Sequence, residues 1–231
     1  MVTLTHWMIA LALLPVVWAA CKILVLMIPS LGAEGIHSWW LYALGIGAYI
    51  GLDRFVAQPM TLYVFGHELT HAVSGILSGA KIHSFKAKAS GGEVRLSKTN
   101  TFISLSPYFV PLYTILLLCL YWLIRKKWDM VELRWMFQFL VGASLSFHVA
   151  MTLRAVHTHQ PDLKGKGFFL SMILILLGNA LIVGLLLVGL FGKTPTLKQY
   201  SKNLYHETTT SWRYIWETSQ EAQRKIQTWT R

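Results

Sequence analysis

Two histidines and a glutamate lie close together within an apolar stretch, Phe65-Gly66-His67-Glu68-Leu69-Thr70-His71-Ala72. On a helix, residues four positions apart share one face, so His67 and His71 can direct ring nitrogens at the same metal ion. Glu68 can then reach a water bound to that metal. Zinc lowers the pKa of such a water to about 7, and a carboxylate can accept its proton as the water attacks a carbonyl. The motif therefore predicts a hydrolytic site with one zinc ion per chain.

The surroundings of the motif favour this interpretation over a chance match. A histidine on an apolar helix is more often a packed core residue than a metal ligand. A glutamate inside a bilayer, however, is unfavourable by several kcal/mol unless a cation or water accompanies it, so an ionisable residue within a membrane segment indicates a functional site. Glu68 therefore strengthens the metal interpretation of its two histidine neighbours.

The composition predicts an all-α polytopic membrane protein with about six transmembrane helices. Hydrophobic residues make up 54% of the 231 residues, and the chain has only ten acidic residues. Apolar runs of about 18 residues or more are typical of spanning helices. The net charge of +11 arises from short basic clusters between these runs and in the tail. Such clusters suit anionic lipid headgroups better than nucleic acid, so we expect the lipid bilayer as a partner and no nucleic acid.

The apolar runs divide the chain into three parts. Residues 1–58 are expected to hold two transmembrane helices, with Pro29 ending the first and a polar link over 30–38. Residues 59–192 are expected to form a core of four transmembrane helices that begins with the metal motif. Residues 193–231 form a basic tail whose apolar residues recur on one helical face, which predicts an amphipathic helix on the membrane surface. The alternative is a tail that binds a partner or is partly disordered. The six runs cover residues 7–28, 39–54, 60–80, 102–124, 135–156 and 168–191.

A less apolar segment, residues 81–100, separates the third run from the fourth. Its apolar residues are spaced among polar ones on both sides of Ser90-Gly91-Gly92, which predicts a short β-hairpin with the glycines at the turn. The alternative is a solvated loop. An exposed edge strand could pair with an extended peptide, so Gly91 and Gly92 are candidate substrate-binding residues.

The third metal ligand must come from elsewhere in the chain, because a catalytic zinc usually has three protein ligands and one open position. Most of the acidic residues lie in links, in the hairpin or in the tail, which leaves Asp162 as the preferred candidate. The third and fifth runs are separated by one return pass, so their C-terminal ends share a side of the membrane, and Asp162 follows the fifth run. His148, within the fifth run, is the competing ligand.

Together, these features resemble the site-2 protease family of intramembrane zinc metallopeptidases. The similarity covers about residues 60–191: the motif helix, the Gly91-Gly92-Glu93-Val94 hairpin, a following helix and a late aspartate. In that family the glutamate of the motif is the general base, which implies this role for Glu68. The implied zinc ligands are His67, His71 and Asp162.

The resemblance also implies the reaction and its setting. The chain would hydrolyse a peptide bond in or near the transmembrane segment of a membrane protein substrate, from an active site that faces the cytoplasm. The family has Asn-Pro and Leu-Asp-Gly signatures where this chain has Gln160-Pro161-Asp162-Leu163. Gln160 is therefore expected to replace the asparagine as a donor to the developing oxyanion. Charge alone does not fix the orientation, because Lys and Arg are similarly numerous in the links on both sides.

A non-catalytic membrane scaffold or a zinc-handling transporter is the alternative function. A transporter would be expected to show internal repeats and several polar residues along a path through the membrane. The sequence shows one polar cluster and no convincing repeat, and a degenerate protease would be expected to have lost Glu68 or a histidine. The enzyme is therefore favoured, while no feature of the sequence indicates an oligomeric state.

Overall fold

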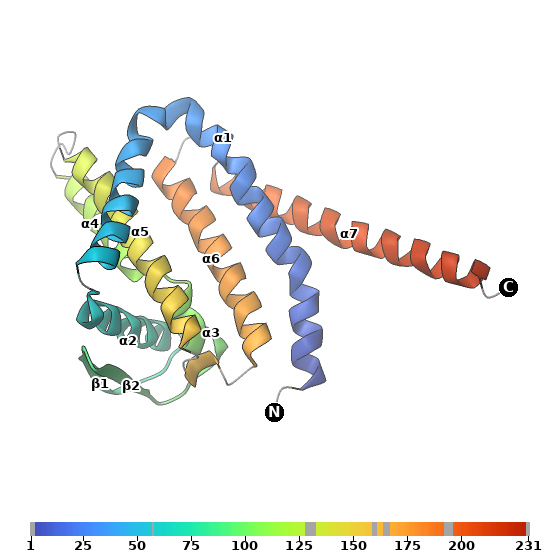
Figure 1. Cartoon of the computed structure of the whole chain (residues 1–231), viewed down its shortest axis with the longest axis horizontal. Helices are drawn as coiled ribbons and strands as arrows, with labels where there is room; N and C mark the ends of the chain where they lie inside the picture. The colour runs from blue at the N-terminus through green and yellow to red at the C-terminus, as the bar shows by residue number, and fades with distance from the viewer. Residues whose placement is uncertain are drawn as a thin grey trace. The chain divides into compact units, whose positions relative to one another are not determined.

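Helices dominate the computed structural model of the chain (Figure 1). The structure describes residues 3–56, 58–127, 133–158, 161–163, 167–191 and 196–229, without the side chains of residues 28–38, 161, 191 and 229. It divides into two compact units, Gly35–Ser171 and Met1–Glu34 with Met172–Arg231. The elements are α1 (Leu4–Phe55), α2 (Met60–Leu77), β1 (Ile82–Lys88), β2 (Gly91–Leu96), α3 (Thr101–Leu105), the 3₁₀ helix η1 (Ser106–Tyr108), α4 (Leu112–Arg125), α5 (Arg134–His157), the 3₁₀ helix η2 (Pro161–Leu163), α6 (Phe168–Phe191) and α7 (Leu197–Trp229).

Among the described residues, three helical segments are long and apolar enough to cross a membrane. They are Leu4–Met27 of α1, all of α5, and Phe168–Leu190 of α6. A fourth span results if the pair Thr101–Tyr108 and Leu112–Arg125, bent by 79°, crosses as one broken unit. Pro107 and Pro111 lie at and beside this bend, and a proline lacks the N–H that a continuous helix needs.

Six spanning helices are not found in the described part of the chain. The motif helix α2 is only 18 residues long, and its two histidines and glutamate reduce its apolarity. No polar link separates two helices at residues 30–38, as the sequence had suggested. The backbone there is helical, because α1 continues through Pro29 from Leu4 to Phe55. A proline removes one hydrogen bond from a helix and need not end it.

The second half of α1 packs closely on α5, within the compact unit Gly35–Ser171. A Cβ atom at Gly45 would lie 2.0 Å from a backbone oxygen of α5, and one at Gly142 would lie 2.1 Å from a backbone oxygen of α1. Farther along the same pair, the Arg154 guanidinium donates to both oxygens of Asp53, at 2.8 and 2.5 Å. These contacts fix the end of α5 that leads toward η2.

The hairpin predicted between the third and fourth runs is present, and both of its strands contact α2 (Figure 1). The strands are antiparallel, with Lys88 opposite Gly91, so Ala89 and Ser90 form the turn. The two glycines therefore begin β2 and do not form the turn itself. Gly91 has φ +142°, a conformation that residues with a side chain rarely adopt.

In the other unit, the predicted amphipathic tail is the 33-residue helix α7. Near its start, one side chain is buried: Tyr200 is 3% exposed and packs with Ile23 and Met27 of α1. The Lys22 ammonium lies 2.7 Å from a carboxylate oxygen of Glu207. Beyond these contacts, the apolar face of α7 is exposed at Trp212, Ile215, Trp216 and Ile226.

Candidate metal centre

The two motif histidines and Asp162 converge in the unit formed by residues 35–171. His67 and His71 lie one turn apart on α2, with ring centroids 4.9 Å from each other. The Nε2 atom of each histidine lies 3.4 Å from Oδ2 of Asp162. One ligand atom from each residue lies within 4.8 Å of the other two, so the group could hold a metal ion. The structure thus brings the predicted third residue to the motif.

A backbone carbonyl orients the ring of His71. Its Nδ1 lies 2.8 Å from the carbonyl oxygen of Ile103, and a carbonyl can only accept a hydrogen bond. Nδ1 therefore carries the proton, and the lone pair of Nε2 points toward Asp162 and the position of a metal. Asn100 holds this carbonyl in place, because its side chain caps α3 by accepting from the N–H of Ile103 at 2.8 Å. The sequence analysis singled out neither Asn100 nor Ile103. An asparagine before a helix is a common cap, but no sequence pattern predicts the contact with His71.

Two hydroxyl groups lock α2 against the segment that carries Ile103. Ser106, which is 0% exposed, donates to the hydroxyl oxygen of Ser74 at 2.8 Å. Ser74 in turn donates to the carbonyl oxygen of Thr70 on α2 at 2.7 Å. This buried chain of hydrogen bonds fixes the distance between the motif helix and the carbonyl that orients His71.

Asp162 lies in η2, a short turn between α5 and α6. The hydroxyl of Tyr108 donates to its Oδ2 at 3.3 Å. Burial of Asp162 opposes ionisation, but interactions with the His67 and His71 side chains outweigh burial and hold the pKa of this carboxyl below its ordinary value. The residue is therefore an anion in this setting, which is the form that binds a cation. Tyr108, which follows Pro107 in η1, was not singled out from the sequence.

Glu68 is packed against the hairpin. A Cβ atom at Gly92 would lie 2.4 Å from Cγ of Glu68 and 2.8 Å from Cγ1 of Val64, so only a glycine lets β2 approach this closely. The backbone N–H of Val94 is also hydrogen-bonded to the Glu68 carboxylate. Gly92 was predicted to bind substrate, and the structure places it against the predicted general base.

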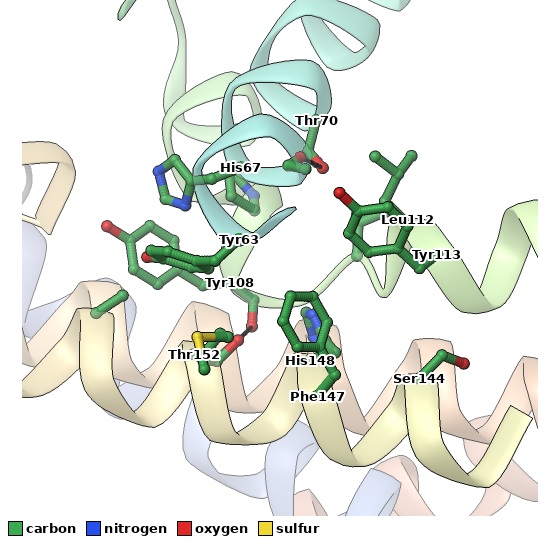
Figure 2. Close-up of a pocket in the computed structure, with 15 residues that line it drawn as sticks. Tyr63, His67, Thr70, Tyr108, Leu112, Tyr113, Ser144, Phe147, His148 and Thr152 are labelled. Atoms are coloured by element: carbon green, nitrogen blue, oxygen red, sulfur yellow. Dashed lines mark hydrogen bonds between the residues drawn. The ribbon is translucent and has the colours of Figure 1, made fainter. Parts of the chain in front are cut away.

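A cavity of about 30 Å³ lies beside His67, lined by α2, α5, η1 and the start of α4 (Figure 2). This volume holds one or two water molecules. His148, the alternative third ligand, lines the cavity from α5 and does not belong to the ligand group found among the described residues. Other labelled residues of the wall are Tyr63, Thr70, Tyr108, Leu112, Tyr113, Ser144, Phe147 and Thr152.

The remaining sequence-based candidates divide between the hairpin and a part of the chain that is not described. Gly91 is the first residue of β2, whereas Gln160 lies outside the described residues.

No family model matches this chain, and no curated protein or solved structure matches it either. The resemblance to site-2 proteases therefore stays a prediction from the sequence.

Proposed function

We propose that this chain is an intramembrane zinc metallopeptidase that resembles site-2 proteases. The observation that carries the proposal is the convergence of His67, His71 and Asp162, whose ligand atoms lie within 4.8 Å of one another. Glu68, a carboxylate next in sequence to the first histidine, gives the site a base. The three apolar helical segments support a membrane setting for this chemistry.

The donor set suits zinc. Two imidazoles and one carboxylate are the ligands of one class of catalytic zinc site, and they leave the fourth position for water or substrate. The hydrogen bond from His71 Nδ1 to a backbone carbonyl and that from Tyr108 to Asp162 are outer contacts of the kind that orient zinc ligands. One zinc ion, held by these residues, would lower the pKa of a bound water and polarise the substrate carbonyl.

Glu68 then performs the proton transfers of peptide hydrolysis. It accepts one proton from the attacking water as the water oxygen bonds to the carbonyl carbon, and the carbonyl π electrons move onto the substrate oxygen. Glu68 returns the proton to the amide nitrogen, the C–N bond breaks, and its electron pair stays on the departing amine. The products are a new carboxyl terminus and a new amino terminus. The hydrogen bond from Val94 and the contact with Gly92 keep this carboxylate in place.

The substrate proposed is a membrane protein whose transmembrane segment unwinds beside the hairpin. An extended peptide could pair with an edge of the two-stranded sheet, and β2 already lies against Glu68. Photocrosslinkers placed at exposed positions of β1 and β2 should capture a substrate, whereas the same probe on the polar face of α7 should not. Equal capture at both places would contradict pairing with the hairpin.

The proposed setting is a multi-pass integral membrane protein whose active site opens toward the cytoplasm. This orientation rests on the family resemblance, and it would place the C-terminal tail on the side of the membrane away from the cytoplasm. Cysteine accessibility in intact cells tests it at the hairpin turn, where Ser90 is exposed. Labelling of a Ser90→Cys variant, with Cys21 and Cys119 removed, only after the membrane is permeabilised would agree with a cytoplasmic site.

The deciding experiment measures zinc content and cleavage on the same purified full-length protein. We expect about one zinc per chain, loss of that zinc in His67→Ala, and cleavage of co-expressed single-span proteins by the wild type. Absence of a transition metal after gentle extraction would refute the enzyme proposal. Bound zinc with no cleavage of any candidate would favour the scaffold, and zinc flux into vesicles that depends on His67 would favour the transporter.

A further inference from the structure

Tyr63 occupies the same face of α2 as the two histidine ligands. It lies four positions before His67, as His67 lies four positions before His71, so the three side chains follow one stripe of the helix. The rings of Tyr63 and His67 have centroids 5.6 Å apart. Figure 2 shows Tyr63 with Tyr108 at the side of the cavity near His67. The phenol is therefore next to the candidate metal centre.

Three tyrosines line this cavity, and their hydroxyl groups differ in what they bind. Tyr108 donates to Asp162 at 3.3 Å, and Tyr113 donates to the carbonyl oxygen of Leu62 at 2.6 Å. The hydroxyl of Tyr63 is buried and has no hydrogen-bond partner within the described part of the chain. Two of the phenols thus have structural partners, and the third is left available.

A buried hydroxyl without a hydrogen-bond partner disfavours folding, and a phenylalanine at this position would avoid that penalty. Tyr63 also lies within electrostatic reach of the carboxylates of Asp162 and Glu68. A phenol in this place can donate a hydrogen bond to negative charge that appears only during the reaction. Such donors, preorganised in a site with little water, give large stabilisation of a developing oxyanion.

We propose that the Tyr63 hydroxyl donates a hydrogen bond to the oxyanion of the tetrahedral intermediate, which makes Tyr63 a catalytic residue. This inference rests on the proposed peptidase function. When the water oxygen bonds to the carbonyl carbon and the π electrons move onto the substrate oxygen, the phenol O–H turns toward that oxygen and keeps its proton. When the C–N bond breaks, the charge returns into the new carboxylate and the hydrogen bond weakens.

The test compares single-atom changes at three tyrosines of one cavity. Tyr63→Phe removes only the hydroxyl, and we expect unchanged zinc content, unchanged KM and a kcat lower by about 10²-fold. Tyr113→Phe is the matched control, because its hydroxyl binds a helix carbonyl, and it should keep kcat within a small factor of wild type. Tyr108→Phe should instead weaken zinc retention during dialysis against a chelator, because it removes the hydrogen bond to Asp162.

A second readout does not depend on turnover. A peptide phosphinate carries two oxygens in the geometry of the tetrahedral intermediate, and its Kd for the zinc-loaded protein can be measured by calorimetry. Tyr63→Phe should weaken phosphinate binding by about the same factor as kcat, while binding of the corresponding uncleavable substrate peptide stays unchanged. Tyr113→Phe should change neither.

The outcomes separate this inference from the proposed function. A wild type that cleaves and binds the phosphinate, together with a Tyr63→Phe variant that does both equally well, overturns the role of Tyr63 and leaves the peptidase intact. Loss of zinc in Tyr63→Phe likewise overturns it, because the hydroxyl would then act on the metal site. A wild type that neither cleaves nor binds the phosphinate overturns the peptidase and the inference with it.

Discussion

Replacing Gly92 by alanine should impair catalysis while zinc stays bound. The added Cβ would lie 2.4 Å from Cγ of Glu68, whereas carbon atoms in ordinary contact are about 3.5 Å apart. The variant must therefore move β2 or Glu68 by about 1 Å. A displacement of that size at a reacting group can lower the rate by about 10²-fold. The His67, His71 and Asp162 group does not include Gly92, so metal content should not change.

Cleavage rate and zinc content are measured together for Gly92→Ala and a matched control, Gly51→Ala. A Cβ at Gly51 meets nothing within 4 Å, so the control adds the same atom in the same unit without a clash. A double variant, Gly92→Ala with Glu68→Gln, shows whether the effect passes through the base. If it does, the double variant should be about as slow as Glu68→Gln alone. Wild-type turnover in Gly92→Ala, or loss of its zinc, would refute this reasoning.

The other predictions concern the base, the third ligand and the C-terminal helix. Glu68→Gln keeps the size of the side chain, so zinc should remain while turnover falls by about 10²-fold or more; wild-type turnover would exclude Glu68 as the base. Asp162→Ala should lower zinc content and activity together, whereas His148→Ala should keep the metal, and the reverse pattern would reassign the third ligand. On α7, a nitroxide in place of Trp216 should be shielded from a water-soluble relaxation agent in vesicles with anionic lipids, and one in place of Arg213 should be accessible. Equal accessibility at the two positions would contradict a surface helix.

Sequence reasoning was accurate where local rules decide structure. The apolar runs predicted at residues 135–156 and 168–191 are the helices Arg134–His157 and Phe168–Phe191, because length and apolarity alone define such helices. It failed at Pro29, where helical backbone continues. A single proline has two structural solutions, a break or an accommodated loss of one hydrogen bond, and contacts outside the local sequence choose between them.

In the hairpin, too, the local sequence predicted one feature correctly and another incorrectly. Alternating apolar residues around two glycines predicted its existence, but they suggested a turn at the glycines. The register places Lys88 opposite Gly91, so the turn lies at Ala89 and Ser90. The glycines have other roles: Gly91 adopts a positive φ, and Gly92 allows β2 to approach Glu68 closely. The role of Gly92 depends on packing against α2, so it could not be predicted from the sequence of the hairpin alone.

The sequence by itself determined the half of the site that one helix carries. Helical periodicity places His67 and His71 on one face with Glu68 beside them, whatever surrounds the helix. Only the tertiary structure decided the rest: that Asp162 and not His148 meets the pair, that the Ile103 carbonyl orients His71, and that a tyrosine is left with an available hydroxyl. These contacts join residues from separate elements. The packing of the helices and the path of the loops set their distances, and no local spacing encodes either one.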